Sequence, residues 1–178
     1  QYPKINFIVG DPIKSITFNQ SEYTDVICLN MEIYKYKDKQ AFIQNVYNWI
    51  RPGGFFVLHL VDKLKFDPVV PAGKPFVLVN PQSFAKKRIT TSSVIFNDFK
   101  YKSDFEIFPN DVVQFKEIFK DTSPGSNKVR ENIHKLWMPS KQTIINQCQE
   151  AGFITYAKID LNTAYKEYQY LYIFQKPE

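Results

Sequence analysis

The run Phe55 to Val61 (FFVLHLV) is apolar at every position except His59. A strand with one solvated face alternates apolar and polar residues, whereas a continuous apolar run indicates burial on both faces. This pattern is typical of a mostly parallel sheet covered by helices. The segments Asp25 to Leu29 (DVICL) and Ile5 to Val9 have the same character. The sequence therefore predicts an α/β fold with three buried strands in its first 61 residues.

Two amphipathic segments are expected to cover these strands. In residues 38–50 four apolar residues recur at helical spacing, and Arg51-Pro52-Gly53-Gly54 is expected to end that helix. A second helix is expected after Ser140, a plausible N-cap, and is ended by Gly152. The apolar positions of the two helices are Phe42, Val46, Trp49 and Ile50, then Ile144, Ile145 and Cys148. Two further strands are predicted at residues 153–161 and 170–174.

The pattern changes between these two parts. From Ile89 to about Met138, apolar and polar residues alternate, and turn signals at residues 109–111 and 123–126 divide the segment. Alternation indicates an antiparallel meander with one packed face. We therefore expect residues 1–62 and 139–178 to form the core, with residues 63–138 a linker and an inserted β-sheet.

Composition excludes several classes of protein. The chain has 178 residues, of which 44% are hydrophobic and 23% charged, which suits one soluble domain able to bury a core. No apolar run is long enough to cross a bilayer, so no membrane partner is expected. The net charge of +5 is spread along the chain, which makes an RNA-binding module only an alternative. Cys28 and Cys148 belong to no metal-binding pattern; we interpret them as buried reduced thiols of an intracellular, cytoplasmic protein, with no metal site.

The order of motifs resembles the class I S-adenosylmethionine-dependent methyltransferases. The most specific part is Asn48 to Phe55 (NWIRPGGF), which is similar to the turn before the fifth strand of that family; the segment Gln147 to Phe153 (QCQEAGF) is the second. The resemblance implies a Rossmann-like sheet of strand order 3-2-1-4-5-7-6, with strand 7 antiparallel. Residues 5–9, 25–29, 55–61, 153–161 and 170–174 would be strands 3, 4, 5, 6 and 7.

Under that resemblance, strands 1 and 2 of the sheet have no counterpart in this sequence. The glycine-rich cofactor loop and the acidic residue that binds the cofactor ribose are missing with them. We expect the sequence to be the C-terminal portion of a longer methyltransferase, inactive alone. A missing N-terminal segment or a partner chain would then complete the sheet, although strand 3 could instead pair with strand 4.

The resemblance also implies where the cofactor, S-adenosylmethionine, would bind. Asp11 follows the first strand, where the matching residue of the family accepts a hydrogen bond from the adenine amino group; the alternative is a turn-forming aspartate in Gly-Asp-Pro. Asn30 and Met31 follow strand 4, where the family lines the cofactor and the methyl-transfer channel. They could equally be only a cap on the strand.

Four residues are candidates for binding the methyl acceptor. Tyr34 could form the wall of a pocket, although a core position is the alternative. Arg130, Asn132 and His134 alternate along one strand and so project from one face, which could bind a carboxylate, phosphate or ribose or could be only solvated. His59 is expected to be a core residue, and no catalytic residue is identified. The sequence predicts methyl transfer to a small molecule or RNA; the alternative is a non-catalytic methyltransferase-like scaffold or subunit that binds a protein partner.

Overall fold

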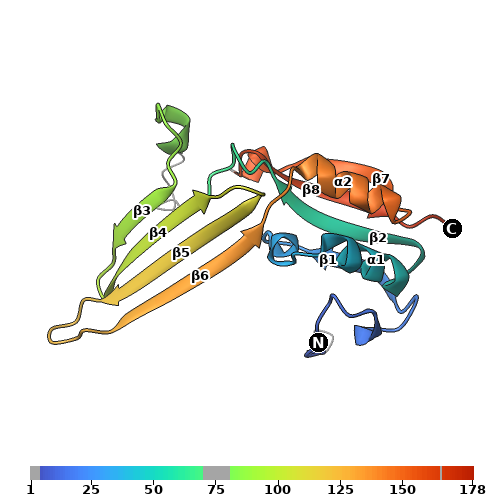
Figure 1. Ribbon diagram of the computed structural model, residues 1–178, viewed down its shortest axis with the longest axis horizontal. Helices are drawn as coiled ribbons and strands as arrows, with labels where there is room; N and C mark the ends of the chain where they lie inside the picture. Colours follow the sequence, from blue (N-terminus) through green and yellow to red (C-terminus); the bar gives the residue numbers. More distant parts are fainter. Residues whose placement is uncertain (1–4, 70–80, 165) are drawn as a thin grey trace.

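The computed structural model describes residues 5–69, 81–164 and 166–178, which form two lobes (Figure 1). Each lobe is built on a four-stranded sheet. The first lobe contains the beginning and the end of the chain, and the second contains the inserted middle part. Within the described ranges, four short 3-10 helices lie between the main elements: η1 (Ser15–Thr17), η2 (Glu32–Lys35), η3 (Pro81–Phe84) and η4 (Leu161–Ala164).

The sheet of the first lobe has the strand order β1-β2-β8-β7. Its strands are β1 (Tyr23–Cys28), β2 (Ile50–Val61), β7 (Ile154–Asp160) and β8 (Gln169–Gln175). β1 is parallel to β2, while β8 is antiparallel to both of its neighbours, β2 and β7. The four predicted strands 4, 5, 6 and 7 are therefore confirmed, including the one that runs against the others.

β2 begins earlier than the sequence predicts. Arg51-Pro52-Gly53-Gly54, expected as a turn after the helix, is part of this strand. A Cβ atom on Gly54 would lie 2.2 Å from the carbonyl oxygen of Thr24, so only glycine lets the two backbones approach this closely. The expected change of direction is nevertheless present inside the strand, because Gly53 has a φ of 77° and the pairing with β1 shifts register here, from Tyr23 opposite Ile50 to Asp25 opposite Phe55.

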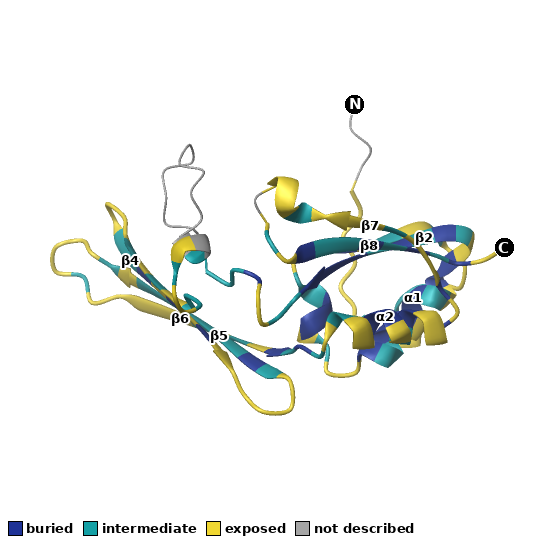
Figure 2. Ribbon diagram, turned by 90° about the horizontal axis from the view of Figure 1, so that it is seen from above, coloured by how far each residue is buried: buried dark blue, intermediate teal, exposed yellow. Residues whose placement is uncertain are grey.

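Two helices cover one face of this sheet (Figure 2). α1 (Lys39–Trp49) begins after Asp38, whose carboxylate accepts a hydrogen bond of 2.9 Å from the backbone N–H of Ala41. α2 (Lys141–Glu150) begins after Ser140, whose hydroxyl accepts one of 3.1 Å from Thr143, as the predicted N-cap requires. The fully buried side chains at the centre of this packing are Phe56, Leu58 and Leu60 of β2, Val46 of α1 and Ile144 of α2.

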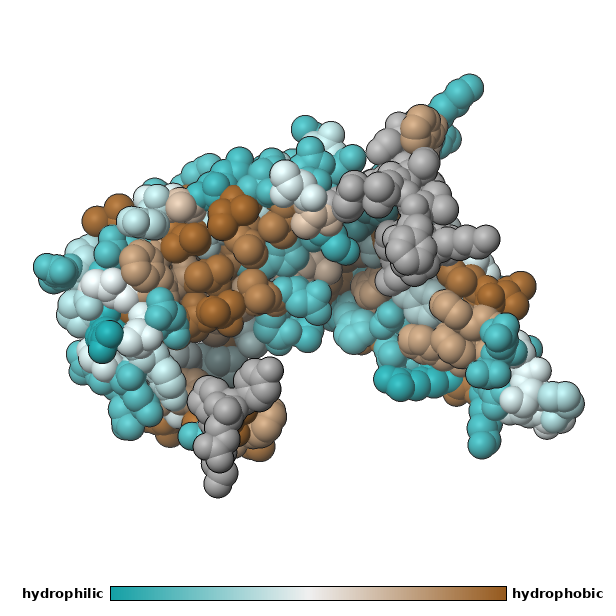
Figure 3. Space-filling view, turned by 180° about the vertical axis from the view of Figure 1, so that it is seen from behind, coloured by the Kyte–Doolittle hydropathy of each residue, from teal (hydrophilic) through white to brown (hydrophobic). Residues whose placement is uncertain are grey.

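The opposite face of the sheet is apolar too, but no described helix covers it. Val57 of β2 lies there because neighbouring side chains of a strand point to opposite faces. It pairs with Ile27 on β1 and Ile173 on β8, and Ile27 is 63% exposed. Seen from this side, the first lobe shows a broad hydrophobic patch (Figure 3). The continuous apolar pattern thus correctly predicts that both faces of the sheet are apolar. In the described residues, however, helices cover only one of the two faces.

The second lobe is an antiparallel meander, as predicted for residues 89–138. Its strands β3 (Thr91–Ile95), β4 (Phe99–Ile107), β5 (Val112–Asp121) and β6 (Val129–Trp137) are neighbours in space in their sequence order. One face is packed, with Tyr101, Phe105 and Val113 buried.

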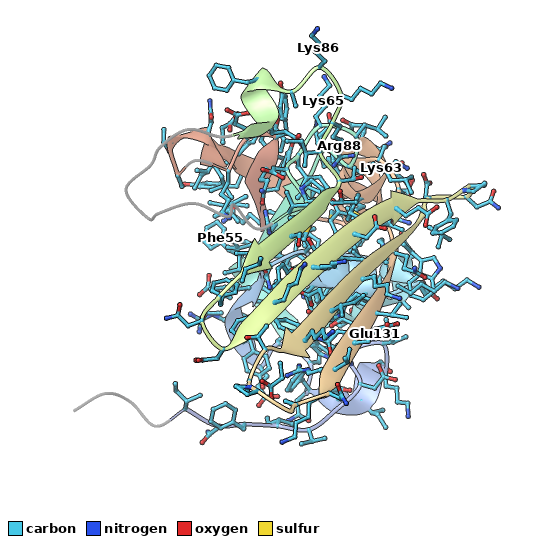
Figure 4. The ribbon with its side chains drawn as sticks, turned by 90° about the vertical axis from the view of Figure 1, so that its left-hand side faces the viewer. Phe55, Lys63, Lys65, Lys86, Arg88 and Glu131 are labelled. Carbon is cyan, nitrogen blue, oxygen red and sulfur yellow. The ribbon has the colours of Figure 1, made fainter. Side chains whose placement is uncertain are left out.

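Arg88 joins the two lobes. Its guanidinium donates hydrogen bonds of 2.7 Å to the carbonyl oxygens of Lys63 and Phe66, which follow β2. It also lies over the rings of Phe66 and Phe105, the latter on β4, at 5.3 and 5.4 Å. Figure 4 shows Arg88 beside Lys63 where the meander meets the linker. The planar guanidinium therefore fixes the position of the meander relative to β2.

The predicted first strand, Ile5 to Val9, is not a strand in the structure. These residues pair with no described strand, and the side chains of Phe7 and Val9 are 92% and 104% exposed. A short apolar segment becomes a strand only where a neighbour satisfies its backbone hydrogen bonds, and β1 does not pair with it. The alternative in which this segment pairs with strand 4 is therefore wrong for the described chain.

Candidate functional site

The chain turns sharply after β1, at Asn30 and Met31. Both residues have left-handed backbone conformations, with φ of 53° and 60°. The N–H of Met31 donates a hydrogen bond of 3.3 Å to Nδ1 of His59 on β2. The other ring nitrogen, Nε2, lies 3.1 Å from the side-chain oxygen of Gln169 on β8. Because Nδ1 accepts, Nε2 carries the proton, and a neutral His59 therefore ties the turn to two neighbouring strands.

His59 is a buried core residue, as the sequence indicates, with 8% of its surface exposed. Burial lowers the pKa of its imidazole, an effect that the hydrogen bond with Gln169 opposes and the charge of Lys166 reinforces. The neutral form that accepts the Met31 N–H is thus the form that burial favours.

A cavity of about 400 Å³ lies between this turn and the meander. The first lobe contributes Asn30, Met31 and His59 to its lining, and the meander contributes Phe115, Glu117 and His134. The structure therefore brings two predicted cofactor residues and one predicted substrate residue into one site. Glu117 and Phe115 were missed from the sequence because only the pairing of β5 with β6 places them beside His134.

Glu117 holds His134 within this cavity. Nε2 of His134 lies 3.2 Å from one carboxylate oxygen of Glu117, and the hydroxyl of Tyr101 donates a hydrogen bond of 2.9 Å to the other. The ring of His134 also stacks on Phe115, with ring centroids 6.2 Å apart. The imidazole is thus oriented by a charged partner on one edge and an aromatic ring on one face.

Arg130 and Asn132 share the face of His134 but not the cavity lining. They pair across the strands with Phe119 and Glu117. Nε of Arg130 donates a hydrogen bond of 3.2 Å to Asn132, and the guanidinium lies 5.7 Å from the centre of the Phe119 ring. Of the three residues predicted on this strand, only His134 lines the cavity.

Tyr34 does not line the cavity and takes the core position that was the alternative to a pocket wall. Its side chain is fully buried, and its hydroxyl accepts a hydrogen bond of 3.1 Å from the backbone N–H of Val61. Burial raises the pKa of its phenol. Tyr34 lies on η2, whose tight turn directs the ring into the core, and the sequence does not reveal that turn.

Asp11 lies on the surface beside a second cavity. One of its carboxylate oxygens accepts a hydrogen bond of 3.1 Å from the backbone N–H of Ile13, which is the turn-forming role. The adjoining cavity, of about 540 Å³, runs along β1 and is lined by Pro12, Phe18 and Tyr36 among others. Burial raises the pKa of Tyr36 to about 12, and the negative charges of Glu32 and Asp11 add to the effect. Asp11 thus lies next to this cavity, whose lining includes its chain neighbour Pro12.

Comparison with solved structures identifies the fold. An S-adenosylmethionine-dependent methyltransferase from Clostridium acetobutylicum matches 95% of this chain with a TM-score of 0.69 at 13% identity. The methyltransferase CcbJ from Streptomyces caelestis matches 96% with a TM-score of 0.70 at 9% identity. An amino pentose methyltransferase from Micromonospora echinaspora, solved with S-adenosylmethionine bound, matches 94% with a TM-score of 0.61 at 14% identity. This is the class I methyltransferase fold.

The match covers only part of each methyltransferase. The chain spans 63% of the length of each of these three proteins. No protein-family model and no curated protein sequence matches the chain. The observed strand order β1-β2-β8-β7 matches the order 4-5-7-6 that the resemblance implies for this part of the sheet. The cavity of about 400 Å³ therefore lies at the carboxyl ends of the parallel strands β1 and β2, where open α/β sheets bind ligands.

The two cysteines and the remaining candidate ligands of the described residues give no sign of other chemistry. Cys28 and Cys148 are free and buried, and burial raises the pKa of the Cys28 thiol to about 12, which leaves it protonated and unreactive. Among the described residues, no three His, Cys, Asp or Glu side chains gather as a metal site requires. Neither α1 nor α2, the longest helices of the described chain, has the length and apolarity needed to cross a bilayer.

Proposed function

We propose that this protein transfers the methyl group of S-adenosylmethionine to a small-molecule acceptor. The observation that carries the proposal is the position of the 400 Å³ cavity. It lies at the carboxyl end of β1, and its walls include the meander residues Phe115, Glu117 and His134. Its volume lies within the range of about 300–1,000 Å³ that is usual for small-molecule sites. One structural neighbour is named as an amino pentose methyltransferase, which supports an acceptor of that size.

The described residues fit the side of the cofactor that they would contact. Asp11 would accept a hydrogen bond from the adenine amino group. The neighbouring cavity is lined by the aromatic residues Phe18 and Tyr36, among others. Asn30 and Met31 would contact the cofactor from the turn after β1. When bound, S-adenosylmethionine supplies an electrophilic methyl group, and the chain then has to position the acceptor beside it.

The acceptor would lie between His134 and the turn after β1. Arg130 and Asn132, farther along β6, would bind polar groups of the acceptor that extend along the meander. Tyr34 is left out of this proposed site because its side chain is fully buried in the core.

We further propose that a missing N-terminal segment or a partner chain completes the sheet beside β1. No described strand pairs with the outer edge of β1. Ile27 on β1 is 63% exposed, and Leu29, which follows β1, is 47% exposed. An unpaired apolar edge favours pairing with another strand. The same added structure would cover the apolar face that contains Val57. The protein would then be an intracellular enzyme of which the chain is a fragment.

The experiment uses the full-length gene product. Calorimetry with S-adenosylmethionine measures cofactor binding, and transfer of a labelled methyl group is followed to a small-molecule fraction and an RNA fraction of a cell extract. We expect binding and label in the small-molecule fraction. Label in RNA alone would contradict the proposed acceptor class. The absence of cofactor binding would refute the enzyme and support a non-catalytic scaffold.

A further inference from the structure

The meander contributes an acid–imidazole pair to the cavity, and the proposed function does not yet use it. Both carboxylate oxygens of Glu117 have partners: Oε1 accepts from the Tyr101 hydroxyl at 2.9 Å, and Oε2 lies 3.2 Å from Nε2 of His134. The side chain of Glu117 is only 19% exposed. The carboxylate is therefore held in the wall of the cavity, while the side chain of His134 is 42% exposed and accessible to a ligand.

This geometry selects one form of the imidazole. A carboxylate can only accept, so Nε2 of His134 has to donate its hydrogen to Glu117. In the neutral ring, Nδ1 then carries the lone pair. In the described part of the chain, no protein group forms a hydrogen bond with that nitrogen. His134 is thus prepared to take a proton at Nδ1, and Glu117 is placed to stabilise the imidazolium that would result.

From this arrangement we infer that the acceptor is a protic nucleophile, an amine or an alcohol, whose proton passes to Nδ1 of His134. The inference rests on the proposed methyl transfer. The acceptor's lone pair forms the new bond to the methyl carbon and displaces sulfur, which keeps the electron pair of the carbon–sulfur bond. The N–H or O–H proton of the acceptor moves to Nδ1, and water later removes it. Glu117 is a positioning residue that acts through the imidazole.

Three other charged groups line the cavity, and their effect on the acceptor differs. Lys35 lies 2.6 Å from Glu32 and is neutralised by it. Asp67 is half-buried, and burial raises its pKa. Lys166 adds a positive charge, which favours the neutral form of an amine near it. A neutral amine has the lone pair that attack on the methyl group needs.

The test follows the two imidazole nitrogens of His134 by NMR in full-length protein with ¹⁵N-labelled histidine. The probes are aniline and phenol, which are both uncharged at neutral pH and differ only in the protic group. We expect the Nε2–H tautomer in the free protein and a change in the Nδ1 signal on adding one or both probes. The probe that causes the larger change identifies the class of acceptor. The opposite tautomer, or no change with either probe at 100-fold excess over the protein, would overturn the inference.

Glu117→Gln and a matched control separate the role of Glu117 from general effects on the meander. Glu131 lies on β6 on the opposite face, where it pairs with Lys116 at 3.0 Å (Figure 4). We expect Glu117→Gln, whose amide can either accept from Nε2 or donate to it, to weaken the tautomer preference, and Glu131→Gln to leave it unchanged. An unchanged preference in both variants would overturn the role of Glu117, because a merely structural residue would not set the tautomer.

Activity gives a second, separate readout. With an identified acceptor, His134→Asn should lower kcat by about 100-fold or more, the usual effect of losing a general base. Methyl transfer that is unchanged in this variant would refute the inference while leaving the methyltransferase in place. Absence of cofactor binding together with a normal response of His134 to the probes would refute the proposed function instead.

Discussion

At the scale of single residues, His59 makes the turn at Asn30 and Met31 depend on pH. Its pKa in the folded protein lies below the unfolded value of about 6.5. As the pH falls below that value, the unfolded chain takes up the proton first, so the free energy of unfolding falls until the folded-state pKa is passed. The slope is at most about 1.4 kcal/mol per pH unit for one proton.

Urea unfolding between pH 7.5 and 5 measures this effect. We expect stability to fall toward pH 5, and His59→Gln to remove the contribution of this histidine from the slope. The same pH profile in the variant and the parent protein would show that another group is responsible. Protonation should also remove the acceptor for the Met31 N–H and so loosen the wall of the cavity.

Substitution of Asp11 should weaken cofactor binding without a matching loss of fold stability. Loss of one charge-assisted hydrogen bond costs about 1.5–3 kcal/mol. Asp11→Ala should therefore weaken cofactor binding by roughly 10- to 150-fold in the full-length protein. Because Asp11 is exposed, the thermal midpoint should change little.

Asp11→Asn is the matched control, since the amide oxygen can still accept from Ile13 but carries no charge. It should keep the turn and lose only part of the affinity. Unchanged affinity and a large loss of stability in the alanine variant would reduce Asp11 to a turn residue.

At the scale of elements, the two faces of β2 should respond differently to truncation. Leu58 is fully buried under the helices, so Leu58→Ala should cost about 2–5 kcal/mol of unfolding free energy. Val57, the adjacent residue, is only partly buried on the uncovered face, and Val57→Ala should cost less than about 1 kcal/mol in residues 1–178. Denaturant unfolding of both variants gives the comparison. Equal losses would mean that the second face is also packed.

The local pattern of apolar residues and helix caps predicted most helices and strands of this fold, but it predicted little of the candidate site. The strands and helices were found because apolar spacing and caps such as Ser140 depend only on neighbouring residues. The segment Ile5 to Val9 failed because its sequence does not say whether a partner strand exists. Glu117 could have been noticed as a charged residue between Phe115 and Phe119 on the packed side of a strand. Its partner His134, however, follows only from the register of β5 and β6.

At the scale of the whole molecule, residues 1–178 should bind S-adenosylmethionine weakly. The chain provides Asp11 and the turn after β1, but no glycine-rich loop was found in its sequence to hold the methionine part of the cofactor. We expect no micromolar affinity in calorimetric titration of these residues alone. A micromolar dissociation constant would show that they contain a complete cofactor site.

In the full-length protein, Val57→Ala should lower the unfolding free energy about as much as Leu58→Ala if added structure covers the open face.

The meander leaves the first lobe after Val61 and returns at Ser140. These two points are close together, because Asp62 and Lys141 lie 3.7 Å apart as an ion pair. A module with adjacent ends can be lengthened, shortened or exchanged without moving the strands that flank it. Replacing this cassette would therefore change the meander side of the cavity wall while β1 and β2 stay as they are. Arg88, whose contacts lie on both sides of that boundary, is the residue that any transplanted cassette would have to retain.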